Sequence, residues 1–222
     1  IAVKGEHTMK KLLIALLTVC CVCLNLTALA NPKLTVKDEE IKQNDNFLLV
    51  YPKVTLDGKQ VIGDKINTYF ARDSQMTVQR YQEERAKGIR KTFEQKYTQS
   101  YYGKHYLCFL YDGYMFYKGA AHPLSWRGGV TFDLKTGADV KWQDLIKDGD
   151  KEAFTLAAIN DKIFNSKEKW RGWLFRDFQG LKKLPKTYYL DTKGYIHFIF
   201  GQYEIAPYAA GIIDLNMEKQ CK

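Results

Sequence analysis

The stretch that decides the fold is Tyr188–Phe200, which reads YYLDTKGYIHFIF. It contains two runs rich in aromatic and β-branched residues, 187–190 and 195–200, and this composition is typical of strands. A third strand is expected over residues 211–217. Together with the helical patterns earlier in the chain, these strands predict an α+β fold, a mainly antiparallel sheet packed against helices.

The longest helical pattern lies in the first half of the chain. Apolar side chains from Ile62 to Phe70 recur on one helix face, and good helix formers continue to Lys87 before Gly88. This pattern predicts one long helix over these residues. Before it, Phe47–Tyr51 has the composition of a strand, which Pro52 is expected to end.

The middle of the chain predicts a hairpin. Residues 104–111 and 114–118 are aromatic and rich in β-forming residues, and the Asp112-Gly113 pair lies between them. An Asp-Gly pair between two such runs is a strong hairpin signal. A further strand is expected over residues 129–134.

Two more helices are expected in the second half. Asp150 is predicted as the N-cap of a helix over residues 152–164, because its side chain can accept from the first free N–H groups. A shorter helix is predicted over residues 168–178, before Gly180 interrupts the pattern.

Residues 1–30 are interpreted as an export signal. Met9–Lys11 supplies positive charge, residues 12–24 form an apolar run, and Ala28–Ala30 has the small-x-small form of a cleavage site. Cleaved export is the first interpretation, and it leaves residues 31–222 as one domain outside the cytoplasm, periplasmic or extracellular. An uncleaved leader that tethers the domain to the membrane is the second, and lipidation of a leader cysteine is the third.

The charge of the chain favours anionic neighbours. The whole sequence has a formal net charge of +9. Removal of residues 1–30 takes away three lysines and one glutamate, which leaves 31 basic against 24 acidic side chains, a net charge of +7. A positive protein attracts cell-wall polymers and lipid head groups even without a specific site. Nucleic acid is not expected as a partner, because export separates the two and no basic recognition helix is visible.

Two of the five cysteines remain after the leader, Cys108 and Cys221. They could form one disulfide in an oxidising compartment. The preferred interpretation is that Cys108, inside an apolar run, is a small buried hydrophobic residue. Neither cysteine belongs to a CxxC pair, so no metal site and no cofactor are predicted.

Three motifs in order give a family resemblance: Gly119–Pro123 reads GAAHP, Thr131–Gly137 reads TFDLKTG, and Tyr188–Gly211 contains the strand pair. In this order and spacing they resemble the extracytoplasmic C-terminal domain of the bacterial anti-sigma factor RsiV. The resemblance covers most of residues 31–222. It departs at Ala120, where the family pattern has a second glycine, and a reshaped loop is expected if that position needs φ > 0.

The resemblance implies a recognition function. The RsiV domain binds lysozyme, and the same domain type occurs beside a separate catalytic domain in a peptidoglycan deacetylase. Since the apolar segment follows Met9 after two lysines, no sigma-factor-binding region is expected here. The function expected is therefore an exported, non-enzymatic domain that binds lysozyme or a related envelope ligand. A binder of anionic wall glycan is the alternative, and a peptidoglycan hydrolase or deacetylase comes last.

The side chains expected to contact the ligand are His122, Trp126, Tyr203, Glu204 and Tyr208. Tyrosine and tryptophan rings suit both protein interfaces and sugar stacking. His122 is the one residue that invites a catalytic role, but a structural role that locks its loop is preferred because no second histidine or nucleophile motif lies nearby. Glu204 is expected to accept hydrogen bonds from backbone or tyrosine groups and so to specify the fold.

Overall fold

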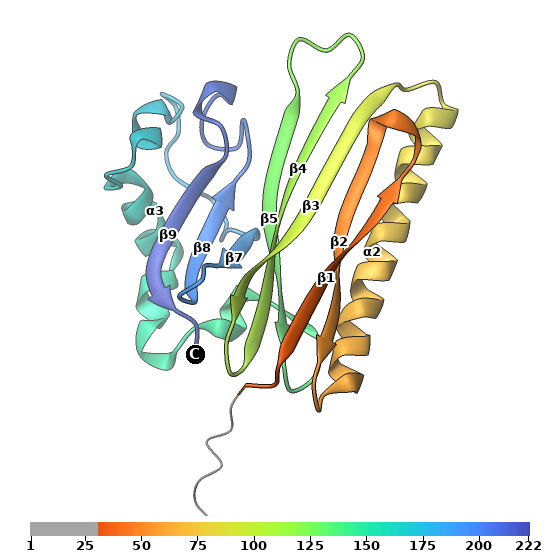
Figure 1. Cartoon of the computed structure of the whole chain (residues 1–222). Helices are drawn as coiled ribbons and strands as arrows, with labels where there is room; N and C mark the ends of the chain where they lie inside the picture. Colours follow the sequence, from red (N-terminus) through yellow and green to blue (C-terminus); the bar gives the residue numbers. More distant parts are fainter. Residues whose placement is uncertain (1–30) are drawn as a thin grey trace, which may run out of the picture. The chain divides into compact units, whose positions relative to one another are not determined.

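The computed structural model describes residues 31–222, so the export signal predicted for residues 1–30 lies outside the described part of the chain. Within Lys33–Lys222, which form one unit, the strands make a six-stranded and a three-stranded sheet (Figure 1). All neighbouring strands are antiparallel except β2 and β3, which are parallel. The predicted α+β class with a mainly antiparallel sheet is confirmed.

The six-stranded sheet follows the order of the sequence. Its strands are β1 Leu34–Lys42, β2 Phe47–Leu56, β3 Lys91–Tyr102, β4 Tyr106–Tyr117, β5 Leu124–Asp133 and β6 Asp139–Val140. The short 3₁₀ helix η1, Asn44–Asn46, joins the first two strands. Strand β1 was missed from the sequence because it is an edge strand rich in exposed charged residues, a composition that protects free sheet edges from association.

Helix α2, Gln60–Ala86, is the crossover between parallel strands β2 and β3, and it confirms the predicted long helix. It buries Ile66 and Phe70 against the sheet. The Asn67 side chain accepts from the Val54 N–H at 2.7 Å and donates to the Val54 carbonyl at 2.9 Å. Strand β3 pairs with β2 only up to Val50, so no strand offers backbone hydrogen bonds to Val54 on that side. The Asn67 side chain makes these hydrogen bonds in place of a neighbouring strand.

Pro52 does not end strand β2, contrary to the prediction. The N–H groups of residues i and i+2 point to the same side of a strand. The Val54 N–H points towards α2 and away from β1, and the Pro52 nitrogen therefore faces the same side. In the described part of the chain, no strand pairs with β2 on that side after Val50. A proline is tolerated there because no ladder hydrogen bond is lost.

The first part of strand β4, residues 106–109, is buried on both faces and lies between the two hydrophobic cores. Leu107 and Phe109 point into the core under α2, where Phe70, Phe109 and Phe132 meet edge to face. Tyr106 and Cys108 point into the second core. The continuous apolar run at 106–110 follows from this position, because a strand covered on both sides has no solvent face to alternate with.

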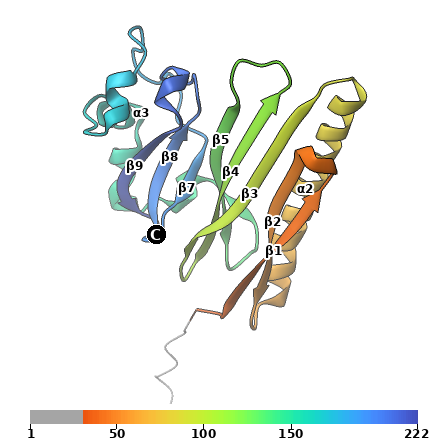
Figure 2. The same cartoon turned by 45° about the horizontal axis from the view of Figure 1, so that its top comes forward.

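The second core lies under the three-stranded sheet, whose strands are β7 Tyr188–Leu190, β8 Tyr195–Phe200 and β9 Ile213–Gln220 (Figure 2). These strands confirm the predictions for the C-terminal part. The remaining helices are α3 Leu156–Phe164 and the 3₁₀ segments η2 Trp142–Leu145, η3 Asp148–Phe154, η4 Lys169–Trp173 and η5 Tyr208–Ala210. Strand β7 crosses close to β5: a Cβ atom on Gly129 would lie 2.5 Å from the Tyr188 carbonyl oxygen.

The hairpin predicted at Asp112-Gly113 is wrong. Strand β4 continues through both residues, and Gly113 pairs with Trp126 of β5. A Cβ atom at position 113 would lie 1.9 Å from the Trp126 indole. The glycine is therefore present so that an aromatic ring can lie flat on the strand, a use of glycine that a sequence does not distinguish from a turn.

Both helix predictions in the second half need correction. Asp150 lies inside η3, and the N-cap of α3 is Thr155, whose hydroxyl accepts from the Ala158 N–H at 3.2 Å. Residues 168–178 form only the short η4 segment. Cys108 and Cys221 are free and buried, so the structure contains the preferred buried thiol and not the alternative disulfide. Burial raises the pKa of both thiols.

Candidate functional site

Three of the five predicted ligand-contacting side chains come together. His122 lies in the β4–β5 loop, whereas Tyr203 and Tyr208 lie in the loop between β8 and β9. The His122 ring centroid is 4.0 Å from that of Tyr208 and 6.2 Å from that of Tyr203, and the two tyrosine rings are 6.0 Å apart. We call these three residues the aromatic cluster. It joins two loops that are about 80 residues apart in the sequence.

Hydrogen bonds determine the proton position on His122. Its Nδ1 lies 3.0 Å from the Pro123 carbonyl oxygen, and its Nε2 lies 3.1 Å from the Tyr203 hydroxyl. A carbonyl can only accept, so Nδ1 carries the proton and Nε2 accepts from Tyr203. His122 thereby holds Tyr203 to the β4–β5 loop, in agreement with the predicted locking role. In residues 31–222, no carboxylate hydrogen-bonds to His122.

Tyr203 is held in an unusual backbone conformation. Its φ is 67°, in the left-handed region that costs a non-glycine residue about 1 kcal/mol. Its side chain is nevertheless 52% exposed, so burial of the ring does not offset this cost. Strain that places an aromatic ring towards solvent is a feature of binding loops.

Glu204 supports the loop from within. One of its carboxylate oxygens accepts from the Gly201 N–H at 2.8 Å, and its own N–H donates to the Gly201 carbonyl at 3.1 Å. The predicted hydrogen bond to backbone is therefore present. Glu204 shapes the turn that carries Tyr203.

Glu204→Gln should lower the free energy of unfolding by about 0.5–1 kcal/mol, because a neutral amide oxygen accepts more weakly than a carboxylate. Urea unfolding measures this difference. Glu152→Gln is the matched control, since the Glu152 side chain is exposed and has no hydrogen bond within residues 31–222. Unchanged stability together with lost ligand binding would show that Glu204 contacts the ligand directly.

Trp126 does not belong to the aromatic cluster. Its ring lies against Phe93 at 5.6 Å on the α2 side of the large sheet, and its indole N–H donates to the Gln95 side chain at 3.0 Å. Its neighbour Ser125 does contact the β8–β9 loop, because the Ser125 N–H donates to the Gln202 side chain at 3.1 Å. The prediction of Trp126 as a residue of the same site is thus not supported by its position.

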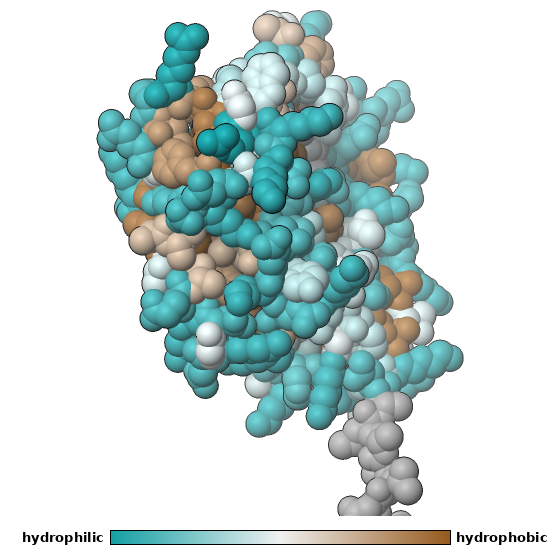
Figure 3. All heavy atoms as spheres, turned by 90° about the vertical axis from the view of Figure 1, so that its left-hand side faces the viewer, coloured by the Kyte–Doolittle hydropathy of each residue, from teal (hydrophilic) through white to brown (hydrophobic). Residues whose placement is uncertain are grey.

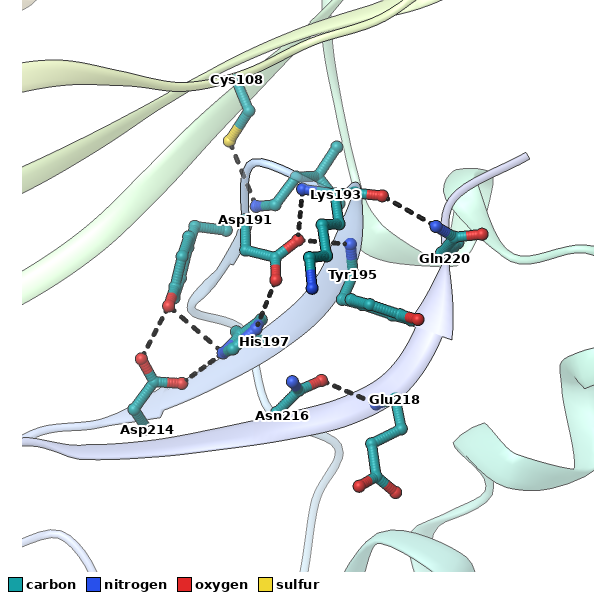
Figure 4. A network of polar contacts seen from close by, with 11 residues as sticks. Cys108, Asp191, Lys193, Tyr195, His197, Asp214, Asn216, Glu218 and Gln220 are labelled. Carbon is teal, nitrogen blue, oxygen red and sulfur yellow. Dashed lines mark hydrogen bonds and ion pairs between the residues drawn. The ribbon is translucent and has the colours of Figure 1, made fainter.

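The sequence analysis missed a half-buried polar network in the small sheet (Figure 4). His197 of β8 lies between two carboxylates, with Nδ1 2.6 Å from Asp214 and Nε2 3.5 Å from Asp191. The Tyr189 hydroxyl donates to the other Asp214 oxygen at 2.7 Å. Burial and this hydrogen bond raise the pKa of Tyr189. The only sign of this network in the sequence was that polar residues occur at alternate positions of otherwise apolar strands.

This network connects the three strands of the small sheet. Asp191 accepts from the Lys193 and Tyr195 N–H groups, which shapes the β7–β8 turn, and Asp214 lies on β9. In the described residues, no serine, threonine or cysteine hydrogen-bonds to His197. The same range holds no cluster of three or more His, Cys, Asp or Glu placed to bind a metal ion, and none of its helices has the length and apolar character needed to span a membrane.

The side of the unit that carries α3 exposes apolar side chains between polar ones (Figure 3). Phe164 at the end of α3 is 37% exposed, and Trp173 in η4 is 51% exposed. Acidic side chains near the start of this region are paired with lysines: Asp148 with Lys151 at 2.9 Å, and Asp150 with Lys219 at 2.9 Å. They therefore do not form a free acidic patch.

Comparison with known proteins gives a family for the C-terminal part of the chain. Residues 143–220 match the family described as a protein of unknown function, DUF3298. This segment runs from η2 to the end of β9 and includes the network of His197 and most of the β8–β9 loop residues described above. No curated protein matches the chain in sequence.

Two solved structures of DUF3298 family proteins have a similar fold. A DUF3298 family protein from Pseudomonas aeruginosa PAO1 is 16% identical, with a TM-score of 0.55 over 85% of this chain and 91% of that one. A member from Bacteroides fragilis NCTC 9343 is 17% identical, with a TM-score of 0.61 over 87% of this chain and 96% of that one. At these identities the similarity concerns the fold and not the ligand.

Proposed function

We propose that this protein is an exported, non-enzymatic binding domain of the RsiV type that recognises lysozyme or a related envelope protein. The observation that carries the proposal is the aromatic cluster, in which Tyr203 is held in a strained backbone conformation with its ring half exposed. Exposed tyrosines on preorganised loops supply much of the energy at protein interfaces. The motif order that includes His122 and Tyr203 supports the RsiV-type assignment.

Charge determines how such a ligand would bind. Lysozymes of the common animal type are basic, and the domain itself has a net charge of +7. Because Asp148 and Asp150 are each paired with a lysine, they offer little compensation. Aromatic contacts and hydrogen bonds from the cluster would therefore supply most of the affinity, and binding should persist at high salt.

The double variant Tyr203→Ala/Tyr208→Ala should weaken lysozyme binding at least tenfold, because it removes one exposed and one half-buried ring from the centre of the proposed interface. A calorimetric titration against lysozyme and against purified peptidoglycan, each across a salt series, measures this effect. Tyr114→Ala is the matched control, since Tyr114 is 37% exposed on β4 outside the cluster. It should change affinity less than twofold.

The same titration separates the alternatives. Binding to peptidoglycan alone that disappears with salt and is insensitive to the double variant would replace the proposal with charge-driven glycan association. Release of sugar or acetate from peptidoglycan by the wild-type protein would replace it with an enzymatic function. Absence of saturable lysozyme binding would end the lysozyme assignment.

A further inference from the structure

A cavity of about 560 Å³, whose wall includes none of the three residues of the aromatic cluster, lies between η1, the C-terminal end of α2, the start of β3 and the end of β4. Its wall includes Asn44, Arg85, Arg90, Phe116 and Lys118. This volume is within the range of small-molecule sites. In both cartoon views the end of α2 and the β4–β5 loop lie at the same end of the unit (Figures 1 and 2).

Three of the four cations in this wall, Arg85, Arg90 and Lys118, have no carboxylate partner within residues 31–222. Within residues 31–222, none of Arg85, Arg90 and Lys118 forms an ion pair, although six other basic side chains pair with Asp or Glu on the surface. Asp45 is the one carboxylate that the described residues contribute to the wall. The unpaired groups therefore leave two positive charges, which attract an anion.

Lys91 forms a fixed part of the cavity. Its ammonium pairs with Glu84 and lies 5.5–6.0 Å from the ring centroids of Tyr81, Phe93 and Tyr117. Only 7% of the Lys91 side chain is exposed. Since Glu84 neutralises Lys91, this pair adds no net charge to the cavity. The contacts with the three rings hold the Lys91 side chain in place.

Arg90 is positioned by the end of α2. Its Nη1 donates to the Arg85 carbonyl at 3.0 Å, and this carbonyl also accepts from the Gly88 N–H at 3.0 Å at the end of the helix. A guanidinium has five N–H donors in a planar fork. The donors on Nε and Nη2 have no partner within residues 31–222, so they can bind an oxyanion without loss of the contact to the helix.

We propose that this cavity binds the phosphate group of a phosphate ester. Two arginines and a lysine, together with Asp45, have a net charge of +2, which matches a phosphate dianion better than a single carboxylate. The arginine fork suits the geometry of phosphate oxygens. The Phe116 ring in the wall suits the apolar or sugar part of the same ligand. The ester is either a soluble molecule or polymer segment, or the head group of an anionic lipid.

Calorimetric titration with glycerol 3-phosphate tests the site. The wild-type protein should bind one equivalent saturably, and Arg85→Gln/Lys118→Gln should weaken binding at least tenfold. The control Arg176→Gln/Lys104→Gln removes the same charge at two exposed positions outside the cavity and should change affinity less than twofold. Neither pair of side chains makes a hydrogen bond or ion pair within residues 31–222, so both double variants should fold.

Two results would overturn the proposal: no saturable binding by the wild-type protein, or an equal loss in both double variants, which would indicate general charge attraction. Vesicles of phosphatidylglycerol and phosphatidylcholine identify the source of the phosphate. Vesicle binding that glycerol 3-phosphate displaces supports a lipid head group, and retained glycerol 3-phosphate binding without vesicle binding supports a soluble ester. Tyr203→Ala/Tyr208→Ala should leave phosphate binding unchanged, which separates this site from the proposed lysozyme surface.

Discussion

Gly113→Ala should lower the free energy of unfolding by about 3 kcal/mol, the upper part of the range for overpacked cores. The new methyl group would lie 1.9 Å from the Trp126 indole. That ring cannot move away easily, because it packs against Phe93 and its N–H donates to Gln95. Urea unfolding followed by circular dichroism measures the change.

Two variants show whether the indole causes this loss. Gly172→Ala is the matched control, since its new methyl group meets no atom within 4 Å and the position does not have a positive φ. It should change stability by less than 0.5 kcal/mol, a surface effect. In a Trp126→Ala background the Gly113→Ala loss should largely disappear, because the obstacle is gone. A loss of the same size in that background would refute the explanation.

Asp214→Ala should lower the free energy of unfolding by about 2–3 kcal/mol, because it leaves two half-buried groups without a partner. The Tyr189 hydroxyl loses its acceptor and His197 loses its closest carboxylate. Strands β7, β8 and β9 are joined by these contacts, so protection from hydrogen exchange in all three should decrease. Chemical denaturation and hydrogen exchange measure the two effects.

Asp177→Ala is the control for this change, since Asp177 is exposed and forms no ion pair or hydrogen bond within residues 31–222. A double-mutant cycle of Asp214→Ala with Tyr189→Phe should give a coupling energy of about 1 kcal/mol, because both variants break the same hydrogen bond. Additive effects in this cycle, or a loss no larger than that of Asp177→Ala, would mean that the network does not stabilise the small sheet.

The predicted elements that were confirmed have strong local signals. Helix α2 shows a regular apolar face, and strands β7 and β8 show β-forming runs separated by a turn. The errors came from residues whose role depends on a distant neighbour. Gly113 was taken for a turn residue, whereas a glycine is needed there because the Trp126 ring lies against the strand. Pro52 was taken for a strand end, because the local sequence does not show that β2 lacks a partner strand on one side.

The residues of the candidate site were also predicted only in part. His122, Tyr203 and Tyr208 were selected from motifs, and the structure brings them together through two loops. Trp126 was selected by the same reasoning, but it packs on the other side of β5 because neighbouring residues in a strand point to opposite faces. The phosphate cavity was not predicted, since its cations come from a helix end, a turn and a strand end.

The sequence by itself determined the α+β class, the long helix, the C-terminal strands and the residues of the aromatic cluster, because periodicity, β-forming composition and loop motifs act over a few neighbouring residues. Only the tertiary structure decided that His197 lies between Asp191 and Asp214, and that Arg85 and Lys118 share a cavity. These contacts depend on strand register and on the packing of distant segments. A shift of one residue in register would turn the His197 side chain to the other face of its sheet, and no local pattern specifies that choice.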